Sequence, residues 1–194
     1  AADEDEGKSG AKGKHMITKS YRSPLGMITL AADARGLTGL WFEGQAHYGA
    51  TLDGEGVPNG LGSASAVLDY TWAWLDTFFA GRAPAYTPPL HLIGTSFQLE
   101  VWGVLQGVPR GSTVTYSWVA DEICHRRLAA GDERSTSPRA VGGAVGRNPV
   151  SIIVPCHRVV GANGALTGYA GGLDRKKWLL DVEKRFCNDA GARL

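Results

Sequence analysis

A cysteine and a histidine stand side by side at positions 156 and 157, within the segment Ile-Val-Pro-Cys-His-Arg-Val-Val of residues 153–160. A cysteine thiolate is a strong, soft nucleophile, whereas the protonated thiol is not. At the reference pKa of about 8.5, only a few per cent of free cysteine is ionised near neutral pH, so a base is needed. His157 is therefore the candidate base for a Cys156 nucleophile. In an isolated pair of this kind, the cysteine is more often a small buried hydrophobic residue than a nucleophile. The surrounding residues are therefore needed to distinguish these two roles.

The segments on either side of the pair favour a chemical role. Asn148 and Pro149 precede it, followed by a short apolar segment at 150–154 that we expect to be buried. A loop rich in glycine follows between residues 161 and 172. If the segment around the pair is extended, adjacent side chains point in opposite directions. An extended course therefore predicts no direct contact between the cysteine and histidine side chains.

The part of the chain that contains the pair predicts four short helices. Thr95 and Gln98 form a possible capping box for a helix that ends near residue 106. Ser117 is the expected cap of a second helix, which ends near residue 128. Ser137 followed by Pro138 is a strong signal for a third helix over 139–145, since proline at the first turn loses no hydrogen bond. An amphipathic helix over 174–186 completes the set.

The part of the chain before residue 89 predicts a small antiparallel sheet and one helix. Two turn sequences, Ser23-Pro24-Leu25-Gly26 and Asp33-Ala34-Arg35-Gly36, divide residues 17–42 into three strands. A glycine-rich loop covers 44–62, and residues 65–80 have the wide apolar face of a helix. Three prolines between residues 82 and 94 mark a boundary between two domains, at 16–89 and 90–194. The predicted fold class is α+β.

Length and composition exclude several classes of protein. With 194 residues, 43% of them hydrophobic and 20% charged, the chain can bury a core and is not wholly disordered. It has no apolar run of about 20 residues, so we expect no membrane segment. The odd, low count of three cysteines argues against a disulfide scaffold and suggests a protein of the reducing cytoplasm. The sequence lacks the spaced pairs of Cys or His residues that are typical of a zinc site, so we expect no metal. Residues 1–15 are small, charged and glycine-rich, which predicts a disordered tail or a leader before Met16.

Several ordered motifs resemble the O6-alkylguanine-DNA alkyltransferase family, also called the methylated-DNA–protein-cysteine methyltransferases. The active-site signature of that family is Pro-Cys-His-Arg-Val, which stands here at 155–159. The resemblance extends over nearly all of residues 16–187. Its other motifs are Ser23-Pro24-Leu25-Gly26, Tyr116, Arg139 to Ala144, Asn148-Pro149, Thr167 to Gly172 and Trp178-Leu179-Leu180 with Glu183. The resemblance implies a small N-terminal domain with a three-stranded sheet and a helix, then a mainly helical domain with a helix-turn-helix.

The resemblance also implies the catalytic residues. Cys156 would accept an alkyl group, and His157 would activate it through a bridging water. Glu183 on the last helix would orient the histidine. Asn148 would be the hinge asparagine between the recognition helix and the active-site strand. No cofactor is implied.

Contacts with DNA and with the damaged base follow from the same motifs. Tyr116 would contact the target base and the adjoining phosphate, and Arg139 would fill the stack left by the extruded nucleotide. Further residues with expected contacts are Ser117, Ala140, Gly142 and Gly143 for DNA, and Val159, Tyr169 and Ala170 for the base. Glycine costs about 1 kcal/mol in a helix relative to alanine, so Gly142 and Gly143 indicate a close approach, either by DNA or by another helix. The connection between Tyr116 and Arg139 is longer than is usual in the family.

The implied function is DNA repair by direct reversal. The alkyl group of O6-alkylguanine in double-stranded DNA would move irreversibly to Cys156, once for each protein molecule, with the protein acting as a monomer. The sequence leaves open O4-alkylthymine as a second substrate, the preferred size of the alkyl group and cooperative binding to DNA. Two alternatives stand beside this hypothesis. One is a damage-sensing DNA-binding protein without transfer, and the other is a Cys/His hydrolase that acts on acyl substrates.

Overall fold

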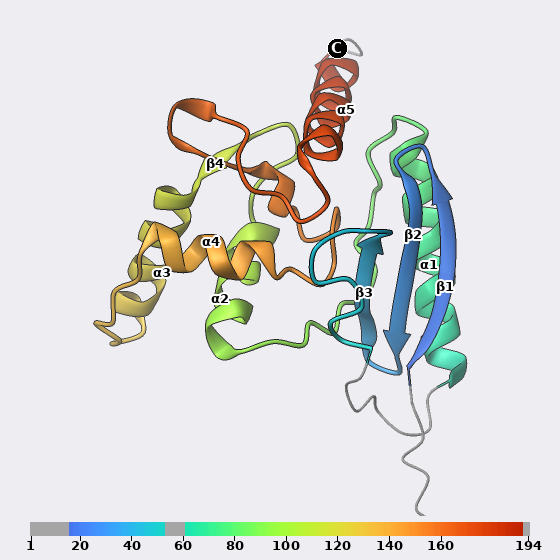
Figure 1. Ribbon diagram of the computed structural model, residues 1–194, viewed down its shortest axis with the longest axis horizontal. Helices are drawn as coiled ribbons and strands as arrows, with labels where there is room; N and C mark the ends of the chain where they lie inside the picture. Colours follow the sequence, from blue (N-terminus) through green and yellow to red (C-terminus); the bar gives the residue numbers. More distant parts are fainter. Residues whose placement is uncertain (1–15, 53–60, 192–194) are drawn as a thin grey trace, which may run out of the picture.

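The computed structural model describes residues 16–52 and 61–191 of the chain, with side chains of the last helix described as far as Phe186 (Figure 1). The expectation for residues 1–15 lies outside this range. Within the described part of the chain, no helix is long and apolar enough to cross a membrane.

The first layer is the antiparallel sheet that the turn sequences predict. Its strands are β1 (Ile17–Ser23), β2 (Gly26–Asp33) and β3 (Gly36–Phe42), in the order β1-β2-β3. The second turn forms because an Asp33 carboxylate oxygen accepts hydrogen bonds from the backbone N–H groups of Arg35 and Gly36. Helix α1 (Leu61–Phe79) covers one face of the sheet and begins four residues before its expected start (Figure 1).

The second layer is helical, as expected. It contains α2 (Ser96–Gln106), α3 (Tyr116–Ala129), α4 (Pro138–Gly146) and α5 (Leu173–Gly191), with a short parallel pair of β4 (Val114–Thr115) and β5 (Val159–Val160). The capping box of Thr95 and Gln98 and the cap by Ser137 are confirmed. Helices α3 and α4 pack against each other, which agrees with a helix-turn-helix.

The expected cap by Ser117 is wrong. Helix α3 begins one residue before Ser117, and Thr115 is the cap, because its hydroxyl accepts a hydrogen bond from the backbone N–H of Trp118. Thr115 also pairs with Val160 at the end of β4. Thr115 is therefore both the last residue of β4 and the cap of α3.

The approach to the Cys-His pair is buried as expected, but it is not an extended strand. Residues 151–154 form turns, and Cys156–Arg158 form the 3-10 helix η1. Ile152 has a φ of 70°, which is strained for a β-branched residue. The side chain of Asn148 stabilises these turns by donating to the carbonyl of Val154 and accepting from the N–H of Val150.

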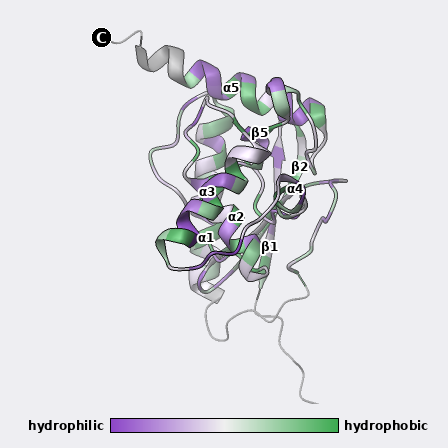
Figure 2. Cartoon of the chain, turned by 90° about the vertical axis from the view of Figure 1, so that its left-hand side faces the viewer, coloured by the Kyte–Doolittle hydropathy of each residue, from purple (hydrophilic) through white to green (hydrophobic). Residues whose placement is uncertain are grey.

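One continuous apolar core joins the two layers. Leu40 of β3 forms a bridge with Val150, and the ring of Phe78 on α1 lies 5.5 Å from that of Phe186 on α5, centre to centre. Helix α5 is amphipathic (Figure 2), and its buried side includes Leu179. The division into two domains at residue 89 stays a prediction, because one apolar core contains residues from both sides of that position.

Candidate active site

Cys156 lies at the start of η1 with only 3% of its surface exposed. Its Sγ atom accepts a hydrogen bond of 3.1 Å from the side-chain amide of Asn148. Burial raises the pKa of the thiol, while the Asn148 hydrogen bond and the positive charge of Lys176 partly oppose this rise. The protonated thiol is therefore the favoured form, and a thiolate at this position would need a base that takes up its proton.

His157 and Glu183 form the pair expected from the motifs. The Nε2 atom of the buried imidazole lies 2.9 Å from Oε1 of Glu183. An ionised carboxylate accepts only, so the neutral ring carries its proton on Nε2 and keeps a lone pair on Nδ1. Nδ1 is buried and has no hydrogen-bond partner among the described residues. Burial lowers the pKa of His157, and the carboxylate opposes this, which leaves a neutral imidazole able to accept a proton.

Glu183 is held in its ionised form by more than the histidine. Arg158 donates from Nε to Oε2 (2.9 Å) and from a terminal nitrogen to Oε1 (2.7 Å), and it also donates to the carbonyl of Val108. The N–H of Gly111 donates to Oε2 at 3.4 Å. Burial by itself raises the pKa of Glu183, but the hydrogen bonds from His157 and Arg158 outweigh it and hold the pKa at about 2. Sequence reasoning assigned no role to this arginine, although it stands inside the Pro-Cys-His-Arg-Val motif.

Lys176 is the second residue that sequence reasoning missed. It is fully buried on α5, and its Nζ atom donates to the backbone carbonyls of Val159 (2.5 Å) and Thr167 (2.7 Å). Burial lowers its pKa to about 8. The available signal was its spacing, since Lys176 stands seven residues before Glu183 and so lies on the same face of one helix. Lys176 ties the loop after β5 to α5 and adds a positive charge near the sulfur.

Two tyrosines stand near the sulfur. The hydroxyl of Tyr116 on α3 donates to the carbonyls of Thr167 and Gly168 at 3.4 and 3.3 Å. Burial raises the pKa of both Tyr116 and Tyr169, and negative charge on Cys156 raises both further. The Tyr169 hydroxyl is buried without a hydrogen-bond partner among the described residues. Both phenols therefore lie close enough to the sulfur for its charge to act on them.

Comparison with known proteins places this site in a family. Residues 96–185 match the model described as 6-O-methylguanine DNA methyltransferase, DNA binding domain. The methylated-DNA–protein-cysteine methyltransferase of Mycobacterium tuberculosis H37Rv is 41% identical over 166 residues, which cover 86% of this chain and 91% of that protein. The chain belongs to the methylated-DNA–protein-cysteine methyltransferase family. The relative of the same name from Methanosarcina acetivorans is 40% identical over 87% of this chain and 98% of its own length.

Solved structures of the family agree with the fold. The Mycobacterium tuberculosis OGT in complex with DNA is 39% identical, has a TM-score of 0.68 and is covered over 92% of its chain, against 86% of this one. An O6-methylguanine DNA methyltransferase from Methanococcus jannaschii is 27% identical, with a TM-score of 0.55 over 87% of this chain and 93% of that one. The α+β prediction is confirmed.

Most of the residues expected to contact DNA lie on α4 and in the first turn of α3, next to Tyr116. Arg139, Ala140 and Gly143 are exposed on α4, and Ser117 is exposed in the first turn of α3. A Cβ atom on Gly142 would stand 3.8 Å from the ring of Tyr116, and one on Gly143 would meet only the end of Arg147 at 3.6 Å. Both are ordinary contact distances, so helix packing does not require glycine at either position.

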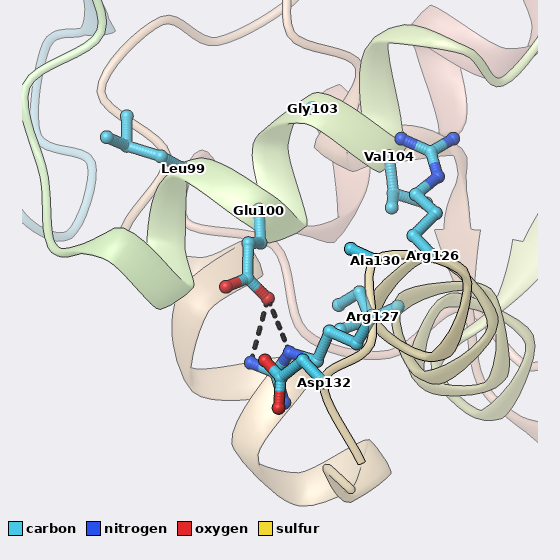
Figure 3. A pocket seen from close by; sticks show the side chains of 9 residues that line it. Leu99, Glu100, Gly103, Val104, Arg126, Arg127, Ala130 and Asp132 are labelled. Atoms are coloured by element: carbon cyan, nitrogen blue, oxygen red, sulfur yellow. Dashed lines mark hydrogen bonds and ion pairs between the residues drawn. The ribbon is translucent and has the colours of Figure 1, made fainter. Parts of the chain in front are cut away.

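The long connection between α3 and α4 is held against α2. Arg127 forms an ion pair of 2.7 Å with Glu100 and donates to the carbonyl of Arg134 in the connection. Arg127 and Glu100 border a cavity of about 350 Å³ between α2 and α3 (Figure 3). The cavity contains none of the candidate site residues, so it is separate from the chemistry at Cys156.

Proposed function

We propose that this protein repairs DNA by moving the alkyl group of O6-alkylguanine to Cys156, once and irreversibly for each molecule. The observation that carries the proposal is the hydrogen bond from Asn148 to Sγ beside a neutral His157 whose proton is held on the Glu183 side. This arrangement supplies a nucleophile, a base and a group that orients the base.

The proposed reaction is a displacement at carbon. The proton of the Cys156 thiol passes to Nδ1 of His157 through a bridging water. The thiolate attacks the alkyl carbon, a C–S bond forms, and the bond from that carbon to O6 breaks. The electron pair of the broken bond stays on the guanine, which takes up a proton, with the hydroxyl of Tyr116 as the proposed donor. The product on the protein is a thioether, which the site has no means to cleave.

The surroundings of the sulfur favour the charged intermediate. A buried thiolate is costly unless hydrogen bonds and opposite charges stabilise it. Here the Asn148 amide and the charge of Lys176 act on the sulfur, and the imidazolium that forms is stabilised by Glu183. The negative charge on the sulfur thus forms only when its proton has moved to His157, and Asn148 and Lys176 then stabilise that charge.

The target base must leave the duplex to reach the sulfur, because its O6 atom lies inside the stack. Extrusion costs a few kcal/mol, and less for a damaged pair. We propose that α4 enters the minor groove, that Arg139 occupies the vacated place, and that Val159, Tyr169 and Ala170 contact the extruded base. The open space beside Gly143 supports a close approach by DNA, since no neighbouring helix uses it.

Replacement of Gly143 by alanine separates folding from DNA binding. A Gly143→Ala variant is expected to be up to about 1 kcal/mol more stable, because alanine is the better helix former and its Cβ atom meets only the end of Arg147. Its affinity for duplex DNA is expected to fall, because the methyl group occupies the approach of the DNA. Urea unfolding and fluorescence anisotropy measure the two effects.

Gly103 on α2 provides the matched control for this variant. A Cβ atom at Gly103 meets nothing within 4 Å, and the residue is exposed on α2, outside the elements proposed to contact DNA. Gly103→Ala should therefore gain helix stability and keep full DNA affinity. Unchanged DNA affinity in Gly143→Ala would contradict the proposed approach.

Stoichiometry tests the proposed function directly. The protein is mixed with excess duplex that contains O6-methylguanine, and its intact mass is followed with time. We expect one methyl group per molecule, located on Cys156, followed by no further loss of O6-methylguanine. Continued loss of O6-methylguanine would contradict a single transfer per molecule, and binding without methyl uptake would indicate a damage sensor.

A further inference from the structure

The side chain of Arg175 joins three segments that are far apart in the sequence. From its place on α5, it donates to the carbonyl of Leu25 in the turn between β1 and β2 (3.0 Å) and to the carbonyl of Gly171 (3.0 Å). It also donates to the carbonyl of Glu43, just after β3, at 3.4 Å. The guanidinium stacks on the ring of Phe42 at 4.8 Å from its centre. The planar fork of arginine suits such a three-way contact, and a lysine could not reproduce it.

A second set of bonds joins the same regions. The N–H of Ala46 donates to the carbonyl of Ala170 at 3.1 Å. The buried side chain of Gln45 accepts from the N–H of Phe42 (2.8 Å) and from the hydroxyl of Ser151 (3.3 Å). The loop after β3 therefore binds both the segment that carries Ala170 and the turn that precedes Cys156.

Gly171 shows how closely the two regions approach. A Cβ atom at this position would stand 2.7 Å from the ring of Tyr169 and 3.3 Å from that of Phe42. The first of these distances is shorter than real Cβ contacts, so a side chain would displace the Tyr169 ring. The N-terminal sheet thus reaches the residues that stand beside the sulfur.

We propose that Arg175 and Gln45 are positioning residues, through which the N-terminal sheet sets the place of Tyr169 and Ala170 and thereby the rate of alkyl transfer. The inference rests on the proposed function, because that function assigns Tyr169 and Ala170 to the extruded base. Lys176 holds the same loop from the other side, at Thr167. The loop that carries the residues proposed to contact the base is then held by Lys176 and, through Arg175 and Ala46, by the N-terminal sheet.

The proposal predicts that loss of the Arg175 side chain slows the transfer step and not the binding of DNA. The hydrogen bonds of Arg175 reach Leu25, Glu43 and Gly171, and none of these residues belongs to α3 or α4. Loss of the guanidinium should therefore slow transfer from bound DNA without weakening the binding of DNA. A displacement of about 1 Å between reacting groups can reduce a rate by about 100-fold, so we expect a fall of about tenfold or more.

The test compares Arg175→Met with Lys177→Met, a change of an exposed neighbour on the same helix. The rate of methyl transfer is measured at saturating O6-methylguanine duplex, and affinity is measured in a Cys156→Ala background, where no transfer occurs. Arg175→Met should transfer about tenfold more slowly with unchanged affinity, and Lys177→Met should behave as wild type. Hydrogen exchange of the amides of residues 166–172 should be faster in Arg175→Met only.

Two further variants keep the test decisive if Arg175→Met folds poorly. Arg175→Lys keeps the charge but not the three-way contact, and Gln45→Met keeps the volume but not the bond to Ser151, so both should slow transfer. Wild-type rates in these variants, or slower transfer matched by an equal loss of affinity, would overturn the inference. Failure of the proposed function appears separately, as a wild-type protein that takes up no methyl group on Cys156.

Discussion

A Cys156→Ala variant is expected to bind O6-methylguanine duplex with wild-type affinity and to take up no methyl group at all. The sulfur is the only atom at this position that can attack the alkyl carbon, and neither Asn148 nor His157 can replace it. The loss should therefore be complete rather than partial. Intact mass after incubation with excess duplex measures it, and peptide mapping locates any methyl group that is transferred.

Cys124 provides the matched control, because it is a free cysteine on α3 that is not fully buried. Cys124→Ala should accept one methyl group per molecule at the wild-type rate. A methyl group found on Cys124 or Cys187 in the Cys156→Ala variant would contradict the assignment of the nucleophile. If Cys156→Ala takes up no methyl group but still binds the duplex, the result supports Cys156 as the nucleophile.

Glu183→Gln is expected to have the largest effect on stability. The change preserves shape but removes the charge that Arg158 and His157 share, and it leaves a buried guanidinium without its carboxylate. Breaking one side of a buried ion pair costs about 3–5 kcal/mol. Transfer should also be slower by about 100-fold, because the imidazolium loses its stabilising anion and less thiolate forms. Urea unfolding at neutral pH and single-turnover kinetics measure the two effects.

The acid dependence of stability gives an independent check on the same residue. The pKa of Glu183 is about 2 in the folded protein, against an ordinary value of 4.5. A lowered carboxylate pKa contributes stability that is fully present above pH 4.5 and is lost as the pH falls towards 2, on the order of 3 kcal/mol in total. The stability difference between wild type and Glu183→Gln should therefore narrow over this range.

Asp181, which is exposed on the same helix, serves as the control. Asp181→Asn should leave transfer unchanged and stability within about 0.5 kcal/mol of wild type at neutral pH. If Glu183→Gln proves as stable as wild type at neutral pH, the carboxylate does not hold the network together. A difference that stays constant between pH 4.5 and 2 would show that its pKa is not lowered.

The sequence alone predicted two strand turns, two helix starts and the identity of the chemical groups. The strand turns at Ser23 and Asp33, the capping box at Thr95 and the helix start at Ser137 all depend on residues within four positions of one another. Such turns and caps depend on short-range hydrogen bonds, so they can be predicted from neighbouring residues alone. The Pro-Cys-His-Arg-Val segment likewise indicated the nucleophile and its base.

Tertiary structure decided which atoms those groups meet. The bond from Asn148 to Sγ requires the turns at 151–154, where Ile152 takes a positive φ that no sequence pattern predicted. Lys176 and Arg175 reach carbonyls on segments as far away as Leu25, and backbone carbonyls carry no sequence signal because every residue has one. Thr115, and not Ser117, is the cap of α3, and the same residue pairs with Val160 of β5. Long-range contacts of this kind depend on packing, and packing is settled only when the whole chain has folded.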